Sequence, residues 1–189
     1  MAHSDNSIIT GKFKGSLGKQ LVFREWQGKT VVAKSPKRRS GDPSPSQVET
    51  QDKFFIASRY AKAVTTGADQ TMAQAYAMVL RPRQNVYSRA LEDFLSPPVV
   101  HRIDTRNYTG AVGGLISTRA TDDFRITKVR VEIYSANGSL LEAGNAEQHT
   151  NGIDWNYTAT QANNPLTGSR IKVIATDVPG NDGTLETVL

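Results

Sequence analysis

The sequence predicts an α+β protein, in which a β-hairpin and three helices precede an antiparallel β-sandwich of about seven strands. Two observations lead to this fold class. Up to residue 95, apolar residues recur mainly at helical spacing, after one hairpin pattern near the start. After Pro97-Pro98, short stretches alternate apolar and polar residues, and turn residues separate them. The change at this proline pair predicts two domains, spanning residues 1–95 and 96–189.

A β-hairpin is predicted over residues 19–34, because two strand patterns flank Gln27-Gly28-Lys29, where glycine can adopt the positive φ of a tight turn. With Gln27-Gly28 as the loop, alternation divides the apolar side chains between two faces. One face carries Leu21, Phe23 and Val32, and the other carries Val22, Trp26, Val31 and Ala33. An isolated hairpin is marginally stable in water, so helices or another chain are expected to cover both faces. The expected assembly surface comprises Leu21, Phe23, Trp26, Val31 and Val32.

A basic loop and three helices are predicted next. Residues 35–45 are rich in proline, glycine and basic residues, which is typical of a loop. The candidate basic patch comprises Lys34, Lys37, Arg38 and Arg39. Helices are expected over residues 45–64, 68–80 and 82–95. Their apolar stripes, which include Val48, Phe54, Phe55 and Ile56, are interpreted as core.

Short strands are predicted throughout the second half. The expected strands span residues 99–103, 111–117, 126–134, 139–143, 153–160, 171–175 and 183–188. Alternation predicts three inward-facing sets: Val129, Val131 and Ile133; Ile153, Trp155 and Tyr157; Ile171, Val173 and Ala175. Trp155 is therefore interpreted as a core residue rather than a platform for a ligand.

Two parts of the chain resemble known families. Gly11-Lys-Phe-Lys-Gly15-Ser-Leu-Gly18, the hairpin, Pro36, Pro43 and Gln51-Asp-Lys-Phe-Phe55 resemble an uncharacterised family of small bacterial proteins, mainly from Bacteroidota. That resemblance implies no activity. Lys128-Val-Arg-Val-Glu-Ile133, Glu142-Ala-Gly144 and Trp155-Asn-Tyr-Thr-Ala-Thr160 are among the segments that resemble bacterial Ig-like modules of surface, adhesive and appendage proteins. This second resemblance implies a spacer, a decoration or a binding tip.

Charge and cysteine content narrow the functional classes. Residues 1–95 contain 15 Lys and Arg against 8 Asp and Glu, a net charge of +7, whereas residues 96–189 carry a net charge of −2. A basic half suits nucleic acid, an anionic surface or an acidic partner domain. The absence of cysteine excludes disulfides and thiolate catalysis. With no visible signal peptide or membrane span, we expect a cytoplasmic protein or one that leaves the cell by a non-Sec route.

No catalytic motif is present, so the sequence favours a protein that is not an enzyme and needs no cofactor. Four carboxylates near one end of the sandwich have two possible roles, calcium binding or the capping of turns: Asp122, Asp123, Asp177 and Asp182. The leading hypothesis is a structural protein that forms a homo-oligomer or polymer through its first half and presents the second half for decoration or adhesion to a surface, carbohydrate or protein. The alternative is a nucleic-acid-binding module that uses the basic patch.

Overall fold

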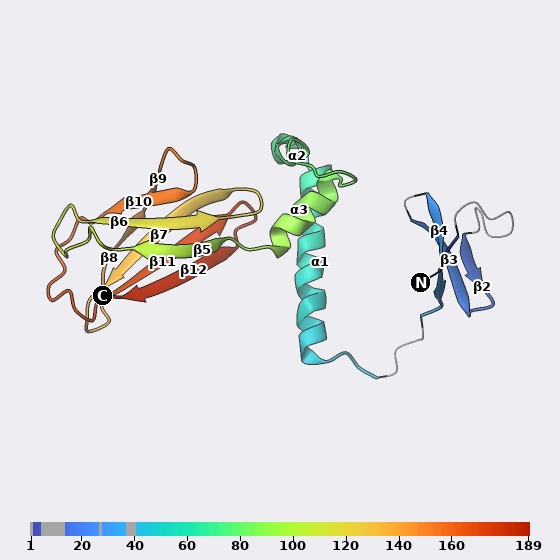
Figure 1. Cartoon of the computed structure of the whole chain (residues 1–189), viewed down its shortest axis with the longest axis horizontal. Helices are drawn as coiled ribbons and strands as arrows, with labels where there is room; N and C mark the ends of the chain where they lie inside the picture. Colours follow the sequence, from blue (N-terminus) through green and yellow to red (C-terminus); the bar gives the residue numbers. More distant parts are fainter. Residues whose placement is uncertain (1, 5–13, 27, 37–40) are drawn as a thin grey trace. The chain divides into compact units, whose positions relative to one another are not determined.

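The computed structural model describes residues 2–4, 14–26, 28–36 and 41–189 (Figure 1). It divides the chain into two units, Met1–Ser44 and Pro45–Leu189. The division therefore falls near residue 44 rather than between residues 95 and 96, where the sequence predicts it. All three helices belong with the strands of the second half, and each unit is described separately below.

The first unit is a four-stranded antiparallel sheet. Its strands are β1 (Ala2–Ser4), β2 (Gly15–Leu17), β3 (Leu21–Trp26) and β4 (Lys29–Lys34), in the order β1-β4-β3-β2. The predicted hairpin is the central pair, and its register is confirmed: Leu21 pairs with Lys34, Phe23 with Val32 and Trp26 with Lys29. The hairpin is not free at its edges, however. β1 pairs with β4 and β2 pairs with β3, so each edge of the hairpin has a neighbouring strand. Strands of three residues are too short to show an alternating pattern in the sequence, which is why these two were not predicted.

The second unit begins with α1 (Pro45–Thr66), α2 (Thr71–Ala77) and α3 (Val86–Leu95). A narrow stripe of small residues on α1 is buried: Ala57, Ala61 and Val64. α3 packs on the C-terminal half of α1 (Figure 1). The Asn85 side chain caps α3 by accepting a hydrogen bond from the Ser88 backbone N–H at 2.8 Å, which sets the start of that helix.

Eight strands complete the second unit. They are β5 (Val99–Asp104), β6 (Leu115–Thr121), β7 (Ile126–Tyr134), β8 (Leu140–Asn145), β9 (Glu147–Gln148), β10 (Asp154–Thr158), β11 (Arg170–Asp177) and β12 (Asp182–Val188). They form two four-stranded antiparallel sheets, in the orders β5-β6-β10-β9 and β12-β11-β7-β8. The predicted fold class is thus wrong in two respects. The first unit is a sheet of four strands rather than a hairpin, and the second has two sheets of four strands rather than an Ig-like sandwich of about seven.

The two sheets share one hydrophobic core. Eight of the nine residues predicted to face inward are buried: Val129, Val131, Ile133, Trp155, Tyr157, Ile171, Val173 and Ala175. Ile153 is the exception, with 40% of its surface exposed, because β10 begins one residue after it. The alternation in these strands is therefore a reliable guide to their burial.

Contacts link the helices to the sheets across the predicted boundary at residue 95. The Asn181 side chain donates a hydrogen bond from Nδ2 to the Phe94 carbonyl oxygen at 3.0 Å. The rings of Tyr76 and Phe124 lie 4.4 Å apart, centroid to centroid. Pro98 is buried rather than part of an exposed linker. Residues 96–189 are therefore not the independent body that the composition change indicates.

Candidate self-association site

The sheet of the first unit has two faces, which its register defines. Residues directly opposite one another on neighbouring antiparallel strands lie on the same face. The leucine face carries Leu17, Leu21, Phe23, Glu25, Thr30, Val32 and Lys34. The tryptophan face carries Val22, Arg24, Trp26, Lys29, Val31 and Ala33. The predicted separation of apolar residues onto two faces is confirmed by this register.

Neither face is well covered. Among the residues of β2, β3 and β4, only Thr30 and Val31 are buried. Leu17 is 63% exposed and Leu21 39% exposed on the leucine face, and Trp26 is 63% exposed on the tryptophan face. Folded domains ordinarily bury an apolar sheet face against a second layer. In the described part of the first unit, no helix or second sheet provides that layer.

The leucine face has opposite charges at its two ends. Glu25 lies at the end of β3 beside Thr30, whereas Lys34 lies at the other end, beside Leu21. Lys14 Nζ lies 2.7 Å from Glu25 Oε2, and its hydrogen bond and positive charge lower the pKa of that carboxyl. The apolar middle of the face is therefore bordered by the ion pair of Glu25 with Lys14 at one end and by the Lys34 ammonium group at the other.

The predicted site residues are only partly brought together. Leu21, Phe23 and Val32 lie on the leucine face, and Trp26 and Val31 lie on the other. Val31 is only 3% exposed, so a partner cannot reach it. In the predicted basic patch, Lys34 is exposed. Lys37, Arg38 and Arg39 lie outside the described residues.

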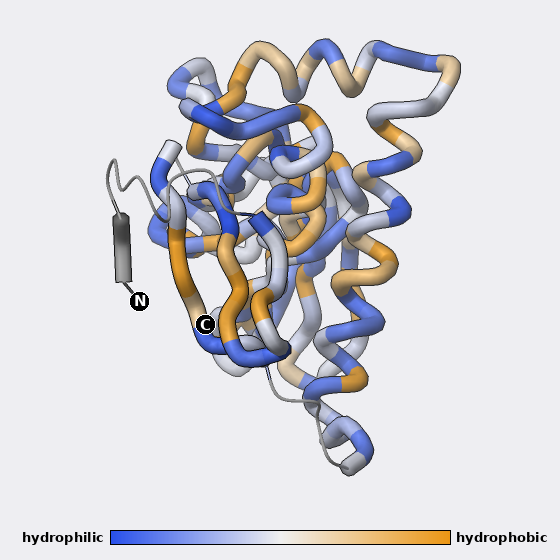
Figure 2. Tube along the Cα trace, turned by 90° about the vertical axis from the view of Figure 1, so that its right-hand side faces the viewer, coloured by the Kyte–Doolittle hydropathy of each residue, from blue (hydrophilic) through white to orange (hydrophobic). Residues whose placement is uncertain are grey.

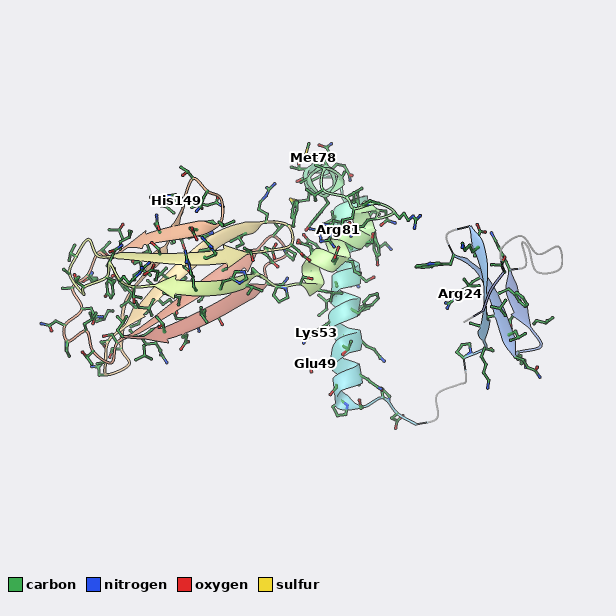
Figure 3. All side chains as sticks on the ribbon, in the orientation of Figure 1. Arg24, Glu49, Lys53, Met78, Arg81 and His149 are labelled. Atoms are coloured by element: carbon green, nitrogen blue, oxygen red, sulfur yellow. The ribbon has the colours of Figure 1, made fainter. Side chains whose placement is uncertain are left out.

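A second exposed apolar surface lies on α1, where the sequence predicts core. Phe54 is 54% exposed, Phe55 59% and Ile56 54%. The N-terminal half of α1 extends past α3, as Figure 1 shows, because α3 has only 10 residues against the 22 of α1. Apolar residues recur along the long helix in Figure 2. This half of the helix is held by local contacts such as Lys53 Nζ to Glu49 Oε1, at 2.8 Å (Figure 3).

A hollow of about 430 Å³ lies on this part of α1, lined by Thr50, Gln51, Phe54, Phe55 and Ser58. The Arg59 guanidinium lies 5.8 Å from the centre of the Phe55 ring. The surface is apolar, but nothing else in the described residues indicates what would cover it. Sequence reasoning missed this exposure, since helical spacing shows that residues share a face and not that another element lies against it.

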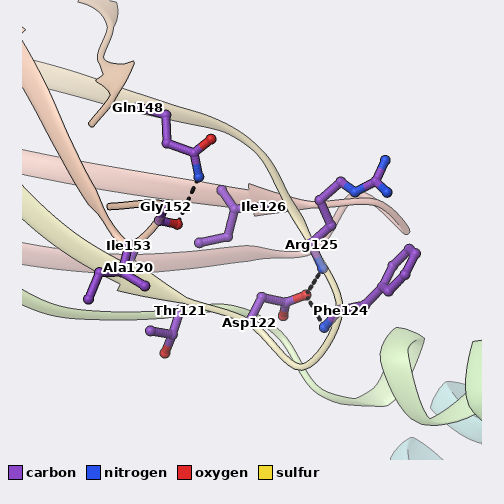
Figure 4. A pocket seen from close by; sticks show the side chains of 9 residues that line it. All are labelled: Ala120, Thr121, Asp122, Phe124, Arg125, Ile126, Gln148, Gly152 and Ile153. Carbon is purple, nitrogen blue, oxygen red and sulfur yellow. Dashed lines mark hydrogen bonds between the residues drawn. The ribbon is translucent and has the colours of Figure 1, made fainter. Parts of the chain in front are cut away.

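Another hollow, of about 380 Å³, lies between two loops at one end of the sheets (Figure 4). Two of its polar side chains bond to the loops that form it. Asp122 Oδ2 accepts hydrogen bonds from the backbone N–H groups of Phe124 and Arg125, at 3.0 and 2.9 Å. Gln148 Nε2 donates to the Gly152 carbonyl oxygen at 2.8 Å. These hydrogen bonds therefore shape the two loops.

Two of the four carboxylates with a possible calcium-binding role, Asp122 and Asp177, cap turns. Asp177 Oδ1 accepts hydrogen bonds from the N–H groups of Gly180 and Asn181, at 2.7 and 2.6 Å. Asp182 Oδ1 accepts one from Thr176 Oγ1 at 2.6 Å. Within residues 41–189 and the other described segments, no three histidine or acidic side chains are arranged to hold a metal. The turn-capping interpretation therefore accounts for the contacts of Asp122 and Asp177, whereas Asp123 lies 3.7 Å from the Arg81 guanidinium.

The fold and this surface define a chain of two units, one of which is an incompletely covered sheet while the other has a core shared by two sheets. No protein-family model and no curated protein match the chain. An engineered protein of known structure is similar over 48% of this chain and 20% of its own length, with 21% identity and a TM-score of 0.31. An endonuclease/exonuclease/phosphatase from Beutenbergia cavernae DSM 12333 is similar over 78% of this chain and 51% of its own length, with 12% identity and a TM-score of 0.28.

These likenesses are too weak to assign a function or family. The chain spans about a fifth of the engineered protein and about half of the Beutenbergia protein. The resemblances to a Bacteroidota family and to Ig-like modules remain expectations from the sequence. None of the helices in the described part of the chain is long and apolar enough to span a membrane.

Proposed function

We propose that this chain is a structural protein that self-associates through the leucine face of its first unit. The observation behind the proposal is that no second layer covers this sheet among the described residues of the first unit, and that Leu17 and Leu21 are exposed on one face. A small sheet becomes stable when its apolar face packs on another layer. Each copy would bring its two-sheet second unit into the assembly, for decoration or adhesion.

The favoured occupant of the leucine face is the same face of a second copy. Consider a two-fold axis that lies between two such faces and runs perpendicular to the strands. In each copy, the end of the face that carries Glu25 then lies over the end that carries Lys34 in the other copy. Apolar residues then meet in the middle and opposite charges meet at the rim, which is the usual anatomy of a specific interface.

Leu21→Lys is expected to convert the full-length protein to a monomer. Burial of a leucine side chain stabilises by about 1.5–3 kcal/mol, and a two-fold interface contains it twice, so we expect the dissociation constant to rise by at least about a hundredfold. Light scattering after size exclusion measures the change. Leu140→Lys is the matched control, because Leu140 is 52% exposed on β8 of the second unit and should tolerate the same substitution.

A charge-exchange experiment tests the identity of the partner. Glu25→Lys and Lys34→Glu should each weaken self-association about tenfold, because like charges then meet at both rims. An equimolar mixture of the two variants should associate again, since every facing pair has become opposite in charge. A mixture that remains monomeric would contradict a two-fold interface on this face. Loss of association with Phe55→Ser but not with Leu21→Lys would place the interface on α1 instead.

The alternative function, nucleic-acid binding, is favoured by the charge of the first unit. Residues 1–44 contain nine Lys and Arg against three Asp and Glu. If the basic patch binds phosphates, replacing Lys37, Arg38 and Arg39 with serine should reduce the slope of log affinity against log salt by roughly 0.9 for each lost contact. A filter-binding titration at several salt concentrations measures this slope. An unchanged slope would show that these three residues do not contact phosphates.

A further inference from the structure

A fully buried carboxylate joins the three helices of the second unit. Asp93, on α3, is 0% exposed, and its Oδ2 accepts a hydrogen bond from the Tyr76 hydroxyl of α2 at 2.6 Å. The Tyr76 and Tyr60 hydroxyl oxygens lie 2.9 Å apart, which extends the hydrogen-bonded chain to α1. Asp93 Oδ1 has no hydrogen-bond partner. A buried ionised carboxylate with a free oxygen is costly, so this group favours its neutral form.

The nearby cation gives Asp93 little compensation. Arg89 is 2% exposed, one turn before Asp93 on α3. Its NH1 atom donates to Glu92 Oε2 at 3.2 Å, and its NH2 atom donates to the Asp123 carbonyl oxygen. Its Nε atom has no partner. The guanidinium is therefore committed to Glu92 and to the loop after β6. Glu92 also accepts a hydrogen bond from Arg81 NH1 at 2.7 Å, so the exposed side of α3 is locally neutralised.

The loops of the sheets bring two further negative charges towards Asp93. Asp122 follows β6, and Asp177 ends β11. Backbone N–H groups hold both side chains in place, and Asp122 Oδ1 is buried without a partner. The turn that Asp177 caps also donates the Asn181 hydrogen bond to the Phe94 carbonyl oxygen. Three carboxylates from three separate elements thus converge where the helices meet the sheets.

We propose that Asp93 is a proton-operated latch between the helices and the sheets of the second unit, closed when its carboxyl is protonated and loosened when it is ionised. Ionised Asp93 repels Asp122 and Asp177, and moving α3 away from the loops is the motion that relieves this repulsion. Protonation removes the charge of Asp93 and with it this repulsion.

The electrostatics of the site support the direction of the switch. Burial raises the pKa of Asp93 to about 6, against an ordinary value of 3.8. The hydrogen bond from Tyr76 lowers this pKa, and the charges of Asp122 and Asp177 raise it. Burial raises the pKa of Asp177 as well. In the closed form the Asp93 carboxyl has a pKa of about 6, whereas in the open form it has its ordinary value of 3.8, so between these values the closed form binds a proton that the open form does not. The equilibrium between the two forms therefore shifts towards the closed form as the pH falls from 7.5 to 5.

Hydrogen exchange on the full-length protein tests the latch. Exchange rates are first corrected for the intrinsic pH dependence of exchange. The equilibrium constant for opening, measured on peptides that cover residues 86–96 and 174–183, should then fall roughly tenfold from pH 7.5 to pH 5. A peptide covering residues 129–133, in the middle of a sheet, is the internal reference, and its protection should change less. Equal changes in all peptides would indicate a global effect on stability and would overturn the proposal.

Two variants separate the latch from a structural role. Asp93→Asn keeps an acceptor for Tyr76 and removes the charge, so its peptides should be at least as protected at pH 7.5 as wild type is at pH 5, with no further pH dependence. Tyr76→Phe removes the hydrogen bond that favours ionised Asp93, so the midpoint of the pH effect should move upward. Asp52→Asn, on the exposed part of α1, should behave as wild type. A wild-type pH effect retained in Asp93→Asn, or a midpoint unmoved in Tyr76→Phe, would exclude Asp93 as the switch.

Discussion

Gly183→Ala is expected to destabilise the second unit severely. Gly183 lies on β12 opposite Ala175 of β11, and a β-carbon there would overlap the carbonyl oxygen of Pro98 and lie 2.7 Å from its carbonyl carbon. Pro98 cannot easily move away, because the next residues, Val99 and Val100, pair with β6. Overpacking costs about 1–3 kcal/mol when side chains can adjust, so we expect about 3 kcal/mol or more against a fixed backbone.

Urea unfolding of the full-length protein, followed by circular dichroism, measures this loss in the free energy of unfolding. Thr184→Ala is the matched control, because Thr184 is the exposed neighbour of Gly183 and its loss should cost about 0.5 kcal/mol or less. A Gly183→Ala variant that unfolds at the wild-type urea concentration would show that the segment between α3 and β5 does not pack on β12. The test therefore also examines how the helices join the sheets.

Glu142→Ala should have the second large effect, because Glu142 bridges the two sheets of the second unit. It lies on β8 and is 8% exposed. Its Oε2 accepts hydrogen bonds from the Tyr157 hydroxyl of β10 at 3.1 Å, and from the Thr160 backbone N–H and hydroxyl at 2.9 and 2.6 Å. Alanine leaves the hydroxyl of the buried Tyr157 unpaired and removes both hydrogen bonds to the exposed Thr160, and the expected cost is about 2–3 kcal/mol.

The same unfolding measurement compares three variants. Glu142→Gln keeps an acceptor oxygen in place and should recover part of the lost stability. Glu147→Ala, at an exposed position on β9, should unfold like the wild type. If Glu142→Ala and Glu147→Ala were equally stable, the carboxylate would contribute nothing to holding the sheets together, and burial of their apolar residues would account for the whole of that contact.

Several features could be predicted from the sequence because they depend on neighbours in the chain. The register of β3 and β4 is the one that the expected two-residue loop at Gln27-Gly28 predicts, and the buried residues of β7 and β11 follow from strict alternation. Strands of two or three residues are too short for such a pattern, so β1, β2 and β9 were missed. The proline pair near residue 97 marks a change of secondary structure, and composition alone does not distinguish that from a boundary between independent bodies.

What the sequence determined by itself is therefore local: which segments form strands and helices, and which side chains of a strand point the same way. The tertiary structure decided what lies against each face. Apolar spacing on α1 is alike at both ends, yet α3 covers Ala57 and Ala61 and does not reach Phe55. The environment of Asp93 likewise depends on Asp122 and Asp177, which are distant in the chain. Burial and electrostatic interaction act through space, so only the packed structure shows which distant residues they join.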